Sequence, residues 1–175
     1  ATYEKGVIQD IEELRNKADP LKDGAETHVA DVDALTKTKM KELIDIAPDS
    51  IKENLRSRLM ANNNRYFGKA LEFQSKATGV KIADEYDKTT SDIANTAFKH
   101  PEYYEAQRQQ ISQVTSDIIK NNPKYNVADL ANLEQDALQK VDFAASKGMI
   151  NNAETPEAID EIIEEMSTEG SIFNT

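Results

Sequence analysis

The chain has 175 residues, of which 38% are hydrophobic and 30% are charged, and its net charge is -11. So low an apolar fraction suits a slim helical bundle, which has much surface and little interior. The absence of cysteine excludes a disulfide framework and thiol chemistry, and no apolar run approaches the roughly 20 residues of a transmembrane segment.

The negative charge is concentrated at the C-terminal end. Residues 151–175 carry seven acids and no Lys or Arg, so residues 1–150 hold 25 acids and 21 bases, a net charge of -4. This asymmetry argues against generic nucleic-acid binding by the whole chain. We therefore divide the chain into a helical bundle over 1–150 and a short acidic C-terminal helix with a frayed tail over 151–175. Because the sequence lacks an initiator Met, we expect a fragment of a longer chain.

Helical spacing of apolar residues predicts the first two helices. The first covers residues 3–18 and ends before Pro20, which disfavours helix at the residue before it. The second covers residues 26–46 and stops at the turn that contains Pro48.

A single helix is predicted over about residues 50–99. Apolar or small residues recur there in steps of three and four, at Leu55, Leu59, Tyr66, Ala70, Phe73, Ala77, Val80, Ala83, Tyr86, Ile93 and Ala97. An unbroken helix of this size would be about 75 Å long. A kink or break at Gly79 is the alternative, because glycine costs roughly 1 kcal/mol in a helix interior relative to alanine.

Three more helices follow. One begins at Pro101 and ends near Pro123, the next covers about 127–149, and a short one begins at Pro156 after a capping Thr155. The predicted fold is therefore all-α, an elongated bundle of five to six helices with one very long helix.

No catalytic, metal or cofactor site is evident. His28 and His100 lack metal-ligand spacing and are expected at the surface or at helix caps. The abundant carboxylates are typical of solvated helix faces, and no glycine-rich phosphate loop or nucleophile motif occurs. We expect no cofactor and no enzymatic activity; a hydrolase without a recognisable motif is the third alternative.

The basic residues of the long helix form a row. Arg58, Arg65, Lys69 and Lys76 are spaced 7, 4 and 7, so they share one side of the helix. One interpretation is a surface that binds nucleic acid or anionic lipid. The other is an edge row, as in a coiled coil, paired with acids of a neighbouring helix such as the C-terminal one.

Asn62 falls on the predicted apolar seam of the long helix. A polar residue there can set register or oligomeric state, and a local kink or wet gap is the alternative. The aromatic residues of HPEYYEAQ, with Tyr66, Phe67 and Phe73, are expected in core packing, with a binding patch as the alternative.

The order of several segments resembles a known family. IANTAFKHPEYYEAQRQQISQVTSDI is followed by ADLANLEQDALQKVDFAASKGMI and TPEAIDEIIEE, and PDSIKENLRSRLMANNNRYFGKALEFQ precedes them. This order, with a P-x-x-Y step from Pro101 to Tyr104, is similar to the helical regions of large internal virion (ejection) proteins of tailed bacteriophages, over residues 25–166.

The resemblance implies a virion-associated structural segment. The expected role is particle assembly or genome delivery through helix–helix contacts with sister subunits or other virion proteins, with homo-oligomers among the expected states. The expected location is the virion, and otherwise the cytoplasm of the producing cell as a soluble protein. Binding of nucleic acid or anionic lipid through the basic row is the alternative function.

Overall fold

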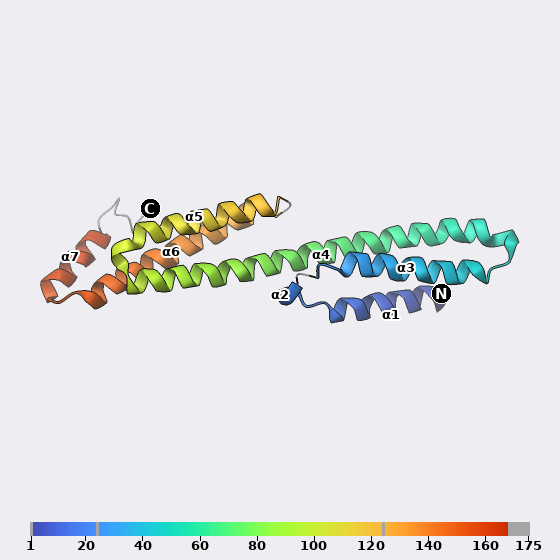
Figure 1. Cartoon of the computed structure of the whole chain (residues 1–175), viewed down its shortest axis with the longest axis horizontal. Helices are drawn as coiled ribbons and strands as arrows, with labels where there is room; N and C mark the ends of the chain where they lie inside the picture. The colour runs from blue at the N-terminus through green and yellow to red at the C-terminus, as the bar shows by residue number, and fades with distance from the viewer. Residues whose placement is uncertain (1, 24, 124, 168–175) are drawn as a thin grey trace. The chain divides into compact units, whose positions relative to one another are not determined.

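The computed structural model describes residues 2–23, 25–123 and 125–167 (Figure 1). Nearly all of these residues are helical and none is in a strand, so the predicted all-α class is confirmed. The helices are α1 (Thr2–Lys17), α2 (Pro20–Asp23), α3 (His28–Asp45), α4 (Asp49–Lys99), the 3-10 helix η1 (Pro101–Tyr103), α5 (Tyr104–Asn121), α6 (Val127–Asn152) and α7 (Pro156–Ser167). Most of the predicted frayed tail, residues 168–175, lies outside the described residues.

The longest helix, α4, confirms the prediction of one very long helix. It has 51 residues and passes through Gly68 and Gly79 without interruption, so the alternative of a break at Gly79 is wrong. The described residues form seven α-helices rather than five or six. The additional one is α2, whose four residues are too few to produce an apolar periodicity.

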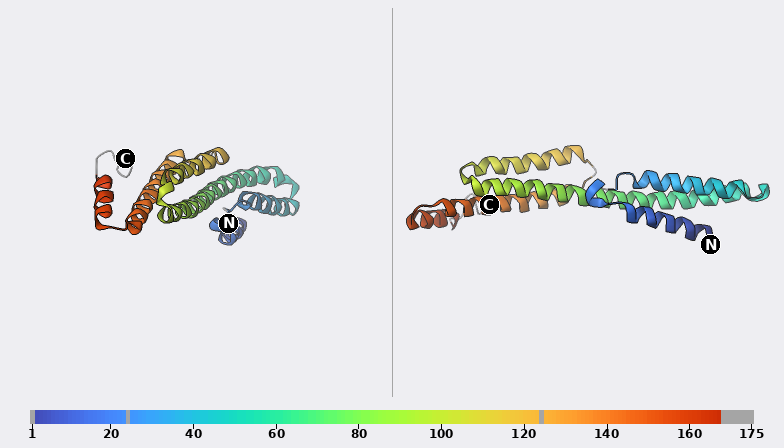
Figure 2. Two further views of the ribbon diagram at one scale, coloured as in Figure 1. Left: turned by 60° about the vertical axis from the view of Figure 1, so that its left-hand side comes forward. Right: turned by 60° about the horizontal axis from the view of Figure 1, so that its bottom comes forward.

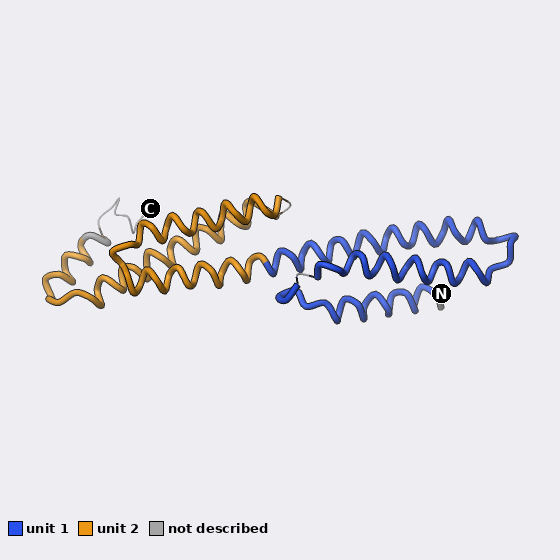
Figure 3. Tube along the Cα trace, in the orientation of Figure 1, with its two compact units in different colours: residues 1–81 blue, residues 82–175 orange. Residues whose placement is uncertain are grey.

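The chain forms two compact units, residues 1–81 and 82–175, and their boundary lies inside α4 (Figure 3). The boundary that the charge distribution suggested, after residue 150, falls within the second unit. The two units are described separately below.

In the first unit, α1 and α3 lie beside the N-terminal part of α4 (Figures 1 and 2). Its core consists of Val7, Val32, Tyr66 and Ala70, one or two from each of the three helices. The first turn of α3 has no capping side chain of its own. Instead, the backbone N–H of Val29 donates to Oε1 of Gln74 on α4 at 3.0 Å, which satisfies a free donor of the helix end.

In the second unit, the rest of α4 packs with α5 and α6 around a larger core. Its buried members are Tyr86, Ala94, Ala97, Tyr104, Ile111, Leu130, Ala137, Val141 and Ala145. Capping residues set the helix starts as expected. Oδ1 of Asn126 accepts from the N–H of Ala128 at 3.0 Å, and Oγ1 of Thr155 accepts from the N–H of Ala158 at 3.2 Å.

The prediction of one continuous seam along α4 is wrong. Buried residues step by seven and four from Leu59 to Ala77, but the next one is Ile82, five residues further on. Val80, which would have continued the seam, is 50% exposed. The change of spacing coincides with the unit boundary, because each part of α4 buries the side chains that its own unit requires.

Candidate interaction surface

The predicted basic row lies on α4 in the first unit, and all four of its side chains are exposed. Each member directly precedes a buried residue of the core seam: Arg58 precedes Leu59, Arg65 precedes Tyr66, Lys69 precedes Ala70, and Lys76 precedes Ala77. One residue corresponds to a rotation of about 100° around a helix. The basic row therefore runs along the border of the packed face, with the same spacing as the core.

The basic row makes little use of its charge in the described part of the chain. Lys76 forms an ion pair with Glu72 of the same helix at 2.8 Å. Arg58, Arg65 and Lys69 make no ion pair with any described residue; Arg65 lies 5.6 Å from the ring centroid of its neighbour Tyr66. None of the four is paired with an acid of another helix.

A row of small residues runs beside the basic row. Ala61, Gly68 and Ser75 are spaced by seven residues, nearly two helical turns, and all three are exposed. A Cβ atom added to Gly68 would meet nothing within 4 Å. These three residues, called the small row below, leave space in which another helix could approach α4 closely.

Large apolar side chains form a third row on α4. Met60, Phe67 and Leu71, called the apolar row below, are 53%, 43% and 51% exposed. They directly follow Leu59, Tyr66 and Ala70, so they border the packed face on the side away from the basic row. The sequence reasoning missed the apolar and small rows, although the shared spacing of seven and four was the signal that could have revealed them.

Asn62 is half-buried and connects two helices of the first unit. Its Nδ2 donates to Oε1 of Glu4 on α1 at 3.0 Å. Helix α4 continues through it, so the alternative of a local kink is wrong. A role in setting the register between subunits stays a prediction.

The two histidines lie in different units. His28 is 3% exposed and packs edge-on against Phe73 at 4.6 Å between ring centroids, and burial lowers its pKa. The expectation of a surface or capping role is therefore wrong for His28. His100 is exposed, with Nδ1 3.4 Å from Oε1 of Glu102. Within the described ranges, no group of three or more His, Cys, Asp or Glu is placed to hold a metal ion.

The predicted aromatic cluster is divided between the two units. Tyr66 belongs to the core of the first unit, and Phe73 packs on His28 there. Tyr104 belongs to the core of the second unit, where burial raises the pKa of its hydroxyl. Core packing, the favoured interpretation, describes these three residues, whereas Phe67 and Tyr103 are exposed.

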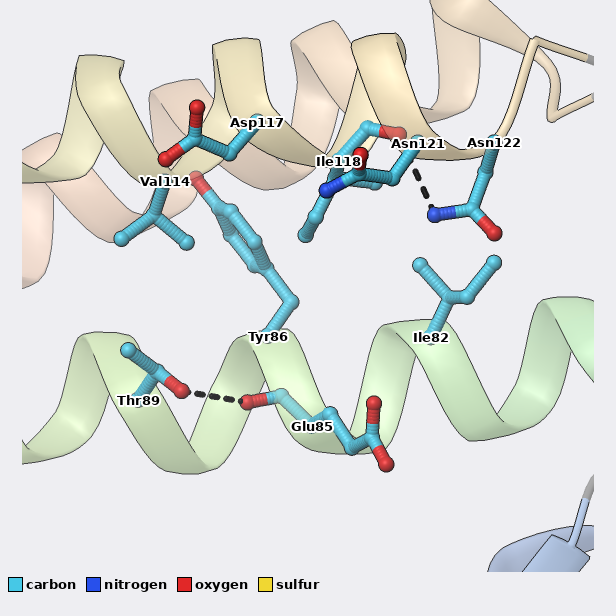
Figure 4. A pocket seen from close by; sticks show the side chains of 9 residues that line it. All are labelled: Ile82, Glu85, Tyr86, Thr89, Val114, Asp117, Ile118, Asn121 and Asn122. Carbon is cyan, nitrogen blue, oxygen red and sulfur yellow. Dashed lines mark hydrogen bonds between the residues drawn. The ribbon is translucent and has the colours of Figure 1, made fainter.

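A groove of about 330 Å³ separates α4 from α5 in the second unit (Figure 4). Tyr86 forms part of its wall and donates its hydroxyl to Oγ1 of Thr115 at 2.9 Å, because the Thr115 hydroxyl itself donates to the carbonyl of Ile111. Burial raises the pKa of Tyr86. The two carboxylates of the groove, Glu85 and Asp117, lie on opposite walls and do not converge on one point.

A partly buried ion pair joins α5 to α6 in the same unit. Arg108 donates to Oδ2 of Asp142, and this hydrogen bond raises the pKa of the guanidinium. The other carboxylate oxygen, Oδ1 of Asp142, is buried without a hydrogen-bond partner. An ion pair in such surroundings holds two helices in one register more than it supplies reactive groups.

Helix α7 is acidic along one side. Glu157, Asp160, Glu161 and Glu164 are all exposed, and the helix contains no Lys or Arg. Glu157, Asp160 and Glu161 make no ion pair with any described residue. Ile163, which is 48% exposed, lies on the same helix. The acids that the sequence considered as partners of the basic row are thus present and solvated.

Comparison with protein-family profiles, with curated proteins and with solved structures finds no match for this chain. Among the described residues, none of the helices contains a stretch apolar enough to cross a membrane.

Proposed function

We propose that this chain is a non-enzymatic structural protein of a tailed-phage particle, which acts in assembly or genome delivery through helix–helix contacts with sister subunits. The segment order that resembles phage ejection proteins supports the setting. The surface of α4 supports the mode of action.

The observation that carries the proposal is the apolar row. Met60, Phe67 and Leu71 place three large side chains, each about half exposed, on one side of a helix whose adjacent side is already packed. Burying the exposed part of such a side chain contributes about 1 kcal/mol. Rows at the spacing of seven and four are also what a second helix recognises in helix–helix packing.

Sedimentation velocity over a wide range of protein concentration tests this function. We expect the weight-average mass to rise with concentration, and we expect the rise to shrink when Met60, Phe67 and Leu71 are all replaced by Gln. A matched control replaces Phe143 and Val127, which are exposed apolar residues of the second unit, by Gln. A chain that stays monomeric at every concentration contradicts the proposal.

The second candidate function is binding of nucleic acid or anionic lipid through the basic row. It is favoured by the exposure of Arg58, Arg65 and Lys69 and by their lack of ion pairs among the described residues. A titration with duplex DNA and with anionic vesicles at low and at high salt tests it. Binding that weakens with salt and is lost when the three bases become Ala supports this candidate, and no binding at low salt removes it.

A further inference from the structure

Three bases of the first unit and three acids of the last helix are both left without ion pairs. Arg58, Arg65 and Lys69 lie on one side of α4, and the small row Ala61, Gly68 and Ser75 lies beside them. This combination of positive charge and open space forms a straight seat for a helix. The seat from Arg58 to Lys69 is about 17 Å long at the helical rise of about 1.5 Å per residue.

Helix α7 has the properties that such a seat requires. Its 12 residues span about 18 Å, close to the length of the seat. Glu157, Asp160 and Glu161 provide three exposed carboxylates, and Ile163 provides one half-exposed apolar side chain. The carboxylates match the bases in number and oppose them in sign, and Ile163 is of a size to fill the space above the small row.

We propose that α7 of one copy of this chain docks on the basic and small rows of α4 in a second copy. This inference rests on the proposed function and specifies the two surfaces that meet. It favours a sister subunit over nucleic acid, because the whole chain carries a net charge of -11 and would repel a polyanion, whereas an acidic helix with an apolar residue fits both rows. Opposite charges on the two surfaces also select the partner and its register.

A charge exchange tests the docking. One variant carries Arg58→Glu, Arg65→Glu and Lys69→Glu, and the other carries Glu157→Lys, Asp160→Lys and Glu161→Lys. Each variant alone presents like charges at the contact, so we expect its self-association to weaken by about tenfold or more. Mixed in equal amounts, the two variants again offer opposite charges, and we expect the association to return.

A control variant separates this contact from the effect of net charge. Lys5, Lys17 and Lys41 are exposed bases of the first unit that make no ion pair with any described residue. The variant with Lys5→Glu, Lys17→Glu and Lys41→Glu has the same change in charge as the α4 variant and is expected to associate like the unmodified chain. Circular dichroism establishes that each variant keeps its helical content.

The outcomes distinguish the docking from the function on which it rests. If the unmodified chain associates but the charge variants associate equally well, or if their mixture does not recover, the docking is overturned and the proposed function stands. If the unmodified chain does not associate at all, both are overturned. Loss of DNA binding in the α4 variant, with unchanged self-association, overturns the docking in favour of nucleic acid.

Discussion

At the residue scale, His28 makes the first unit sensitive to acid. The imidazole is 3% exposed, and burial lowers its pKa, while Asp31 acts to raise that pKa and Arg15 to lower it. The folded state therefore favours the neutral ring more than the unfolded chain does. This contribution to stability is fully present above the usual histidine pKa and is lost as the pH falls below it.

We expect the free energy of unfolding to fall between about pH 7.5 and about pH 5.5, and to fall less in His28→Gln. Urea unfolding of both proteins at the two pH values measures the difference. Replacement of the exposed His100 by Gln serves as the control and is expected to leave the pH dependence as it is. Equal pH dependence in the unmodified chain and in His28→Gln would contradict the assignment.

The same residue illustrates a limit of sequence reasoning. His28 opens α3, where a histidine commonly faces solvent, and nothing in the local pattern distinguishes it. Its burial depends on Phe73, which is 45 positions further along the chain. Residues whose surroundings are made by another helix cannot be placed from periodicity alone, whereas local features such as the caps Asn126 and Thr155 can.

At the scale of the helix, Gly148 allows α6 to approach the end of α4 very closely. A Cβ atom at this position would overlap the backbone carbonyl of Phe98, and a backbone atom cannot move aside as a flexible side chain can. The contact between the two helices in the second unit therefore depends on the absence of a side chain.

We expect Gly148→Ala to lower the free energy of unfolding by about 1–3 kcal/mol, because the two helices must separate. Gly6→Ala is the matched control, since Gly6 is also inside a helix and an added Cβ would meet nothing within 4 Å. That control is expected to gain up to about 1 kcal/mol from helix propensity. Urea unfolding of both variants decides the matter, and similar effects of the two substitutions would contradict the close contact.

The helices themselves were the most predictable level. The bounds of α4 lie within a residue of those predicted, because Pro48 and Pro101 flank it and its periodicity is sustained. The basic row was identified correctly as one side of this helix. Its lack of ion pairs could not be predicted, because pairing depends on which acids the neighbouring helices present. The four-residue α2 was missed because it has no periodicity.

At the scale of the whole molecule, the decisive feature is that two separate sets of residues form the two cores. Val32 is central to the first, and Val141 is central to the second; both are 0% exposed. The sequence suggested one seam, because apolar residues recur without pause through Val80. The division at residue 81 became visible only when burial distinguished Val80 from Ile82.

We expect each core to respond to its own substitutions. Val32→Ala removes two buried carbons and is expected to lower stability by about 2 kcal/mol, with faster amide hydrogen exchange in α1 and α3. Val141→Ala is expected to do the same in α5 and α6. Uniform loss of protection over all helices in either variant would show that the two units unfold as one.

The shared spacing of the basic row and the core seam has a consequence for how this protein can evolve. Inserting or deleting a single residue between Arg58 and Lys76 would turn everything that follows by about 100°, which moves an arginine or lysine into the position of a buried side chain. Length changes within α4 are therefore tolerable only in steps close to whole heptads. Natural variants of different length are expected to differ instead in the connections between helices, such as residues 18–27.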